Sequence, residues 1–250
     1  MSRSAATARN RAKGSRNIVS SLSAHRAFMH ARNLYGSRDY KQGFEYLKNA
    51  AELGHIRANE WLGDIYDYGL GTESNRKLSF KHYKIAADAG NPNAEYHIGV
   101  FYYVGIAVRK SYRDAIFWFR RAHQHGDCTA TYMLGECYRL GRGVAKNKKK
   151  GFVFEIRAAH KGVLDAQHSV GLCFAEGEGV TVDLRRAFKW FLKAAKRGHN
   201  DAAYNVAKFY EEGRGVKRNQ AKSGFWYARS RELYLQRCST DIYERGKNNL

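Results

Sequence analysis

The sequence predicts an all-α protein built from stacked antiparallel helix pairs with a 36-residue repeat. Three observations predict this fold. Small and apolar residues hold fixed places in successive units, a Gly-x-Gly-Val loop follows the first helix of several units, and glycines close the units without any insertion. The closing glycines are Gly54, Gly90, Gly126, Gly162 and Gly198.

The repeated unit begins with a helix that ends in glycine. From Ala58 to Tyr68 the apolar and small residues recur at spacings of three and four, which places them on one helix face. Gly63 lies inside this helix, where glycine costs about 1 kcal/mol relative to alanine, so its recurrence predicts close contact with a neighbouring helix. The small residues at the start of the helix are Ala58, Ala94, Ala130, Ala166 and Ala202.

A loop and a second helix complete each unit. The loop reads Gly-x-Gly-Val from Gly141, Gly177 and Gly213, and Thr72 and Ala107 weaken the two earlier copies. The second helix, about residues 77–89 in the first full unit, carries apolar residues and closes at a glycine suited to a left-handed C-terminal position.

These motifs resemble the Sel-one-like repeat family, whose tandem helix pairs are related to tetratricopeptide repeats. The resemblance rests on A-x-x-x-L-G-x-x-Y, then G-x-G-V, an aromatic pair such as Trp118/Phe119 or Trp190/Phe191, and A-A-x-x-G, and it covers residues 40–230. It implies a right-handed α-solenoid that serves in protein interactions, often as an adaptor. Some family members carry regularly placed cysteine pairs, which this sequence lacks.

The predicted organisation has four parts. Residues 1–17 are a disordered basic arm without large apolar side chains. Residues 18–54 are a degenerate capping helix pair, because the end repeats of a solenoid need an altered outer face. Residues 55–236 hold five repeats, and residues 237–250 form a polar tail. The arm is rich in Arg and Ser and free of acidic residues, which also fits a mitochondrial transit peptide, although it lacks the apolar face of one.

The chain carries more positive charge than the repeat pattern explains. The net charge is +21, and without residues 1–38, which hold eight basic and no acidic residues, it is still +13. Basic residues gather about one repeat apart between the two helices of successive units, so stacking would align them as a basic edge that attracts acidic protein, nucleic acid or anionic lipid. The alternative is that they only solubilise the loops. The basic edge comprises Arg109, Lys110, Arg113, Lys146, Lys148, Lys149, Lys150, Arg185, Arg186, Lys217 and Arg218.

A second set of positions lies on the first helix of each pair. By analogy with tetratricopeptide repeats, these positions face a concave groove, and tyrosine there provides a large amphipathic contact surface. The alternative is that these tyrosines pack against the next helix. The predicted groove residues are Tyr96, Tyr103, Tyr132, Arg139, His168, Leu172, Tyr204 and Lys208.

The sequence gives little support for catalysis or metal binding. Cys128, Cys137 and Cys173 have no C-x-x-C spacing, and Cys137 and Cys173 occupy equivalent places in adjacent units, where buried free thiols are the expected state. No histidine belongs to an H-E-x-x-H motif, and Gly-x-Gly-Val is not followed by the Gly-Lys-Ser/Thr of a phosphate-binding loop. We expect no catalytic residues, no metal site and no cofactor.

Two functions remain open. The first is a non-enzymatic scaffold or adaptor that binds a protein or peptide partner, expected to be acidic, in the groove. The second is a nucleic-acid-associated protein or a subunit of a ribonucleoprotein or organellar assembly that uses the basic edge. No apolar run reaches the roughly 20 residues of a membrane span, so we expect a soluble intracellular protein. Its location would be cytoplasmic, or mitochondrial if the arm is a transit peptide.

Overall fold

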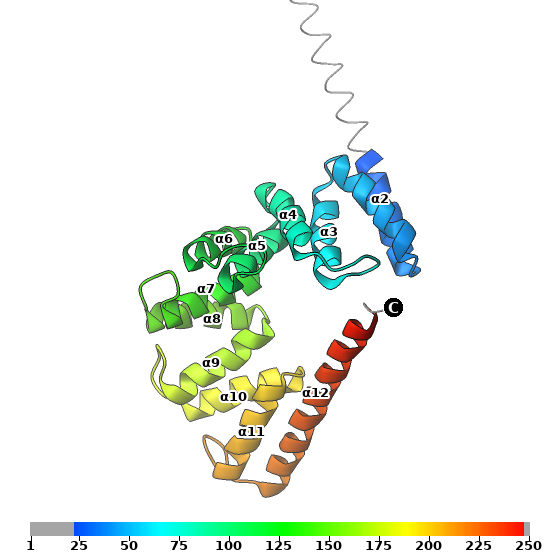
Figure 1. The fold of residues 1–250 in the computed structure, drawn as a ribbon. Coiled ribbons are helices and arrows are strands. Elements are labelled where there is room, and N and C mark those ends of the chain that lie inside the picture. Colours follow the sequence, from blue (N-terminus) through cyan, green and yellow to red (C-terminus); the bar gives the residue numbers. More distant parts are fainter. Residues whose placement is uncertain (1–22, 248–250) are drawn as a thin grey trace, which may run out of the picture. The chain divides into compact units, whose positions relative to one another are not determined.

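The computed structural model describes residues 23–247, and this part of the chain contains helices and no strand. The predicted basic arm, residues 1–17, lies outside it. The helices pack as successive antiparallel pairs, which confirms the predicted helical-repeat solenoid (Figure 1). The chain divides into two compact units, Met1–Phe101 and Tyr102–Leu250, and each is described by itself.

The first unit holds the N-terminal helices. Residues 23–36 are helical, and α2 (Tyr40–Glu52), α3 (Ile56–Tyr68), α4 (Arg76–Asp88) and α5 (Pro92–Val104) follow, with the unit boundary inside α5. Phe28, Leu47, Leu62 and Ile65 form its core with small residues of the same helices.

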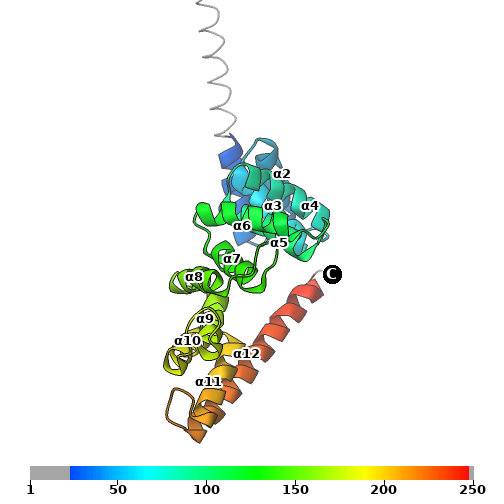
Figure 2. The same cartoon turned by 90° about the vertical axis from the view of Figure 1, so that its left-hand side faces the viewer.

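The second unit continues the same alternation of helices. Its helices are α6 (Tyr112–Gln124), α7 (Cys128–Leu140), α8 (Lys148–His160), α9 (Leu164–Glu176), α10 (Leu184–Lys196), α11 (Asn200–Glu212) and α12 (Gln220–Lys247). Figure 2 shows α7 to α11 following one another, with α12 alongside α11. We call α7, α9 and α11 the first helices of their pairs and α6, α8, α10 and α12 the second helices.

Capping residues start the second helices at 36-residue intervals. A short polar side chain before each helix accepts a hydrogen bond from the backbone N–H three residues later, which satisfies one of the unpaired donors of the first turn. In five of the six, the cap's own backbone N–H donates to the carbonyl of an aromatic residue in the preceding helix, as Asn147 does to Tyr138 at 2.7 Å, whereas Asp39 donates to the carbonyl of Leu34. The loop is therefore closed at both ends. These caps are Asp39, Asn75, Ser111, Asn147, Asp183 and Asn219.

Glycines of the loops end the first helices and allow the repeats to approach. Gly141, Gly177 and Gly213 cap α7, α9 and α11 in the left-handed conformation. The second loop glycine also has a positive φ, and at Gly179 a Cβ would overlap the carbonyl of Lys148 in the preceding pair. Ala107 takes the same place in the weakened copy and keeps a φ of 60°, which L-residues other than glycine rarely adopt.

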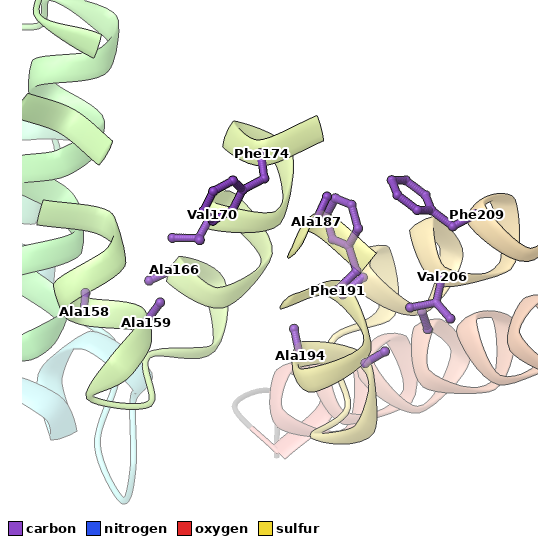
Figure 3. Close-up of a cluster of buried hydrophobic side chains, with 13 residues drawn as sticks. Ala158, Ala159, Ala166, Val170, Phe174, Ala187, Phe191, Ala194, Val206 and Phe209 are labelled. Atoms are coloured by element: carbon purple, nitrogen blue, oxygen red, sulfur yellow. The ribbon is translucent and has the colours of Figure 1, made fainter. Parts of the chain in front are cut away.

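The core of the second unit alternates small and large side chains. Ala166 and Val170 of α9 face Ala187 and Phe191 of α10, and Phe209 of α11 extends the cluster (Figure 3). A Cβ on Gly171 would lie 2.5 Å from Cε1 of Phe191. The glycine inside the first helix therefore makes room for the aromatic ring of the second helix, which confirms the close contact expected from the recurrence of Gly63.

The last helix is longer than the others. α12 has 28 residues and runs to Lys247, so the helix continues through most of the polar stretch 237–250 that the sequence sets apart as a tail. Searched for long apolar helices, the described residues contain none that could cross a membrane.

Candidate partner-binding site

The predicted groove residues of the second unit lie on its first helices and on the end of α5. Tyr132 and Arg139 belong to α7, His168 and Leu172 to α9, and Tyr204 and Lys208 to α11. Tyr96 lies in the first unit, where its ring meets His97 edge to face at 5.2 Å.

Two of these side chains already pack inside the second unit. Tyr132 and Leu172 are half-buried against the hydrophobic cluster of α8 to α11. Burial raises the pKa of the Tyr132 hydroxyl, and the nearby carboxylates of Glu136 and Glu155 add to the effect. A phenol in this position stays protonated and offers a partner only its partly exposed surface.

His168 links α9 to α11. Its Nε2 accepts a hydrogen bond from the side-chain amide of Asn205 at 2.9 Å, and its ring lies 4.5 Å from the ring of His199. Burial, together with the electrostatic effect of the nearby His199, lowers the pKa of His168 to about 4. The imidazole is therefore neutral near pH 7 and acts as a hydrogen-bond acceptor between two repeats.

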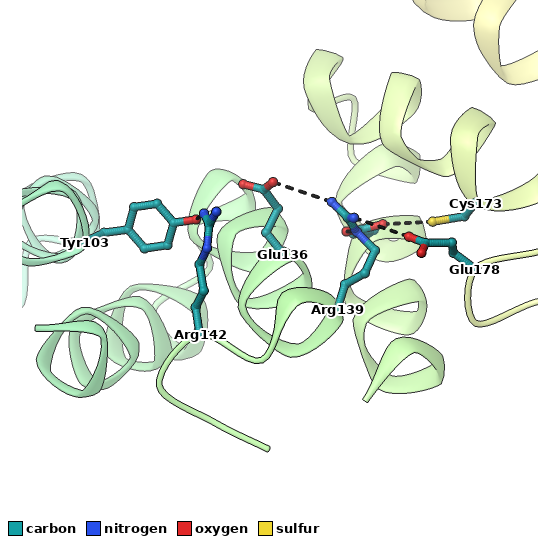
Figure 4. Close-up of polar contacts among 7 residues, drawn as sticks. Tyr103, Glu136, Arg139, Arg142, Cys173 and Glu178 are labelled. Carbon is teal, nitrogen blue, oxygen red and sulfur yellow. Dashed lines mark hydrogen bonds and ion pairs between the residues drawn. The ribbon is translucent and has the colours of Figure 1, made fainter. Parts of the chain in front are cut away.

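Tyr103 also contacts the following repeat. Its hydroxyl accepts a hydrogen bond from Nη1 of Arg142, in the loop after α7, and the guanidinium lies 5.3 Å from the centre of the tyrosine ring (Figure 4). Tyr112 meets the same ring edge to face at 5.3 Å. This tyrosine is held in place by its neighbours before any partner binds.

Arg139 forms the centre of a polar network between the pairs α7–α8 and α9–α10 (Figure 4). Its Nε donates to Glu155 at 3.0 Å and its Nη1 to Glu178 at 3.3 Å, while Glu136 lies 3.6 Å from Nη2. Cys173 donates its thiol to the other oxygen of Glu155 at 3.2 Å. Burial opposes the charge of Arg139. The hydrogen bond that Arg139 donates to Glu155 and the attraction between the two charges outweigh this effect and raise the pKa of the guanidinium.

Sequence reasoning missed this network, although the sequence carries its signal. Glu155 stands 36 residues from Phe119 and from Phe191, so a carboxylate occupies the place of an aromatic ring. A charged residue at a buried repeat position requires a partner of opposite charge, and Arg139 is the basic residue on the facing helix. The network shows that Arg139 has a structural role, whatever else it contacts.

Tyr204 is the exposed member of the groove residues in the second unit, and Lys208 lies beside it. Tyr204 is 48% exposed and meets Tyr227 of α12 edge to face at 5.4 Å. The ammonium of Lys208 lies 6.0 Å from the centre of the Tyr204 ring and 4.0 Å from Glu212. Tyr227 in turn donates to Glu211 at 2.7 Å. We call Tyr204, Lys208 and Tyr227 the tyrosine patch.

The residues of the basic edge are exposed throughout. Lys148 pairs with Glu178 at 2.8 Å and Arg186 with Asp183 at 3.2 Å. Lys150 lies over the ring of Tyr138, and Lys110 over that of Tyr112. With the side chains of residues 23–236 the remaining members form no ion pair. They are Arg109, Arg113, Lys146, Lys149, Arg185, Lys217 and Arg218.

The cysteines and histidines form no metal centre in the part of the chain that the structure describes. Cys137 and Cys173 are buried free thiols, as the sequence predicts, and Cys128 is a partly exposed one. Burial raises the pKa of Cys137 to about 12, so this thiol is unreactive near neutral pH. His123 contacts Thr131 at 2.8 Å, and His125 is the C-terminal cap of α6.

The model of the Sel1 repeat family matches six segments of the chain: residues 27–55, 56–91, 92–127, 129–163, 164–199 and 200–234. A Sel1 repeat protein from Oxalobacter formigenes of solved structure is 29% identical with a TM-score of 0.77, and the match covers 82% of this chain and 84% of that protein.

Two further solved structures are similar. The protective antigen c5321 of uropathogenic Escherichia coli, described as displaying an SLR fold, is 25% identical with a TM-score of 0.76, and the match covers 84% of this chain and 46% of that protein. The immunity protein Pa5087 from Pseudomonas aeruginosa is 19% identical with a TM-score of 0.55, and it shares the fold. No curated protein sequence matches the chain significantly.

Proposed function

The chain belongs to the Sel1 repeat family, and we propose on this premise that it is a non-enzymatic scaffold that binds a protein or peptide partner along the first helices of its pairs. The observation that carries the proposal is the tyrosine patch. Most other groove residues contact the next repeat, whereas Tyr204 is 48% exposed and is held in position by its contact with Tyr227. Rigid, amphipathic aromatic side chains of this kind dominate the binding energy of protein interfaces.

The chemistry of the patch indicates the kind of partner. Lys208 provides a positive charge at the edge of the tyrosine rings, and it is only loosely paired with Glu212 at 4.0 Å. A peptide with an apolar or aromatic side chain beside an acidic residue would fill both parts of the patch. We therefore propose that the partner is acidic. We also propose that the protein acts inside the cell.

α12, which contributes Tyr227 to the tyrosine patch, also carries exposed apolar side chains further along the helix. Tyr234 and Leu235 are each 56% exposed, and α12 packs against α11. Large apolar side chains left open on the final helix of a repeat array suit contact with a partner.

The experiment places a photoreactive benzophenone side chain at position 204 of the full-length protein in the native cell. Position 225, where Phe225 is 63% exposed on α12, serves as the matched control. We expect a defined protein to be cross-linked from position 204 and not from position 225, and nuclease treatment to leave that product unchanged. The variant Tyr204→Ala should lose the same partner in affinity purification at fixed wash salt. Identical products from both positions, or none, would contradict the proposal.

A further inference from the structure

In the second unit, α7, α9 and α11 differ in charge from α6, α8 and α10. The first helices α7, α9 and α11 carry Arg139 and Lys208 as their basic residues against a larger number of Asp and Glu. The second helices α6, α8 and α10 are basic, and their acidic residues are Asp114 and the fully buried Glu155. The excess of positive charge in this unit therefore extends far beyond the loops of the basic edge.

The second helices lie next to one another with the same face turned outward. Each buries equivalent positions, such as Ala122, Ala158 and Ala194. Direct ring contacts join them: His123 of α6 meets Phe154 of α8 at 5.5 Å, and His160 of α8 meets Trp190 of α10 at 5.2 Å. Their exposed faces therefore form one continuous surface of the second unit.

The cations of this surface come from all three helices. α10 has no acidic residue at all, and its exposed face consists of Arg185, Arg186, Lys189, Lys193 and Lys196. α8 adds Lys148, Lys149, Lys150 and Arg157, all exposed. α6 adds Arg113 and Arg120. We call this surface the outer basic face.

Helix stability does not account for the cations at the starts of α8 and α10, although it favours Arg157, Lys193 and Lys196 in the last turns. Lys148, Lys149 and Lys150 occupy the first turn of α8, and Arg185 and Arg186 the first turn of α10. The helix macrodipole makes this end positive, so a cation there is unfavourable by about 0.3–1 kcal/mol. Within the described residues no carboxylate pairs with Lys149, Arg157, Arg185 or Lys189.

Tyr138 contacts a basic residue of α6 and a basic residue of α8. Its hydroxyl accepts a hydrogen bond from Nη2 of Arg120 at 3.0 Å, and the ammonium of Lys150 lies 4.3 Å from the centre of its ring. Burial by itself would raise the pKa of this phenol, yet the two cations lower it. Two positive charges from neighbouring helices thus meet at one side chain.

We propose that the outer basic face binds nucleic acid through its phosphates, without reading the sequence of bases. Adjacent helices lie about 8–10 Å apart, so α6 to α10 span on the order of 20 Å, along which a duplex presents roughly 12 phosphate charges. The cations cover this span, and α10 itself carries no acidic residue, the carboxylate beside it being the cap Asp183, which pairs with Arg186.

A membrane surface fits this face less well. Stable attachment of a helical surface to lipid needs apolar side chains that insert beside the cations. Phe117 and Val153 are exposed on α6 and α8, but the described residues of α10, the most basic helix, include no exposed large apolar side chain. The most basic helix of the face therefore lacks the apolar side chains that would insert into a lipid bilayer.

The test measures binding of the full-length protein to a fluorescently labelled RNA strand and to a DNA duplex by anisotropy over a range of salt concentrations. The face variant carries Lys149→Gln, Arg157→Gln, Arg185→Gln and Lys189→Gln. The control variant loses the same charge from exposed residues of the first unit, through Arg32→Gln, Arg38→Gln, Lys41→Gln and Arg57→Gln.

We expect the wild type to bind with a steep dependence on salt. In the face variant the slope of log K against log salt on the duplex should become shallower by about 0.9 for each lost phosphate contact, and its affinity at low salt should fall at least tenfold. The control variant should change much less, and circular dichroism should show that both variants keep their helices.

Three outcomes would overturn the proposal. The first is equal weakening in the two variants, which would indicate a response to net charge alone. The second is unchanged binding in the face variant, which would assign the contact to the basic residues before position 38. The third is binding of the wild type to phosphatidylserine vesicles but to neither nucleic acid.

Discussion

Nε of Arg139 lies 3.0 Å from Oε1 of Glu155, in a place where the equivalent residues of the two neighbouring pairs, Phe119 and Phe191, are aromatic. Glu155 is fully buried, and the side chain of Arg139 is 20% exposed. A Cβ on Gly135 would lie 2.6 Å from Cγ of Glu155, so this glycine makes room for the carboxylate as Gly171 does for Phe191. The pair α7–α8 thus has an ion pair where the pair α9–α10 has an aromatic ring, and in both pairs a glycine of the first helix makes room for the side chain of the second helix.

Replacing Arg139 by alanine should destabilise the protein by about 3–5 kcal/mol, because it leaves the carboxylate of Glu155 buried without its cation. Urea unfolding monitored by circular dichroism measures the loss. The matched control is Arg142→Ala, which removes a contact to the partly exposed Tyr103 and should cost only about 1 kcal/mol.

The double variant Arg139→Leu, Glu155→Phe tests the same relationship in the opposite direction. It restores an aromatic ring at position 155 and removes both charges together, so it should be far more stable than Arg139→Ala and close to the wild type. An equal loss in the double variant and in Arg139→Ala would show that position 155 requires a carboxylate for another reason.

The substitution Gly171→Ala should destabilise the protein by about 1–3 kcal/mol, because the new methyl group overlaps the ring of Phe191 and forces the helices apart. Thermal unfolding checks it. Gly224→Ala is the control: α12 has open space around Gly224, so alanine there should stabilise the helix by up to about 1 kcal/mol. A neutral result at Gly171 would mean that α9 and α10 can separate without cost.

Removing the cap of α8 by Asn147→Ala should cost about 1 kcal/mol, since the N–H of Lys150 loses the side-chain oxygen it donates to at 2.9 Å. Asn147→Asp should keep the cap, and its negative charge would also suit the lysines of the first turn. Chemical denaturation compares the three proteins. A loss as large in the aspartate variant would point to a contact of the amide nitrogen.

Acidification should weaken the fold through His168. Its pKa is about 4 in the folded protein and 6.5 in an unperturbed histidine, so between pH 6.5 and pH 4 the unfolded chain binds the proton more readily. The free energy of unfolding therefore falls as the pH falls through this window, on the order of 3 kcal/mol from this one group, and no further below pH 4.

The variant His168→Gln isolates that contribution. It cannot take up the proton, so it should lose less stability than the wild type between pH 6.5 and pH 4, as measured by urea unfolding at each pH. His160→Gln removes an exposed histidine of α8 instead and should keep the full loss. Parallel curves for the wild type and His168→Gln would contradict the assignment.

The sequence by itself determined the repeat, and the reason is local. A cap such as Asn147 and a left-handed glycine such as Gly177 act on backbone groups within a few residues. Their 36-residue spacing therefore predicts helix pairs and the side that each helix buries. The buried cysteines and the contact across the helical glycine followed from the same periodicity.

Only the tertiary structure decided which of the predicted groove residues are accessible to a binding partner. Arg139, His168 and Tyr204 hold comparable places in the sequence pattern, yet the first lies in an ion-pair network, the second accepts a hydrogen bond from Asn205, and the third is exposed. Exposure depends on which side chains of the next repeat reach each position, and those residues lie about 36 places away in the chain. The alignment of cations across α6, α8 and α10 has the same origin, because their adjacency comes from the packing of whole repeats and not from any local signal.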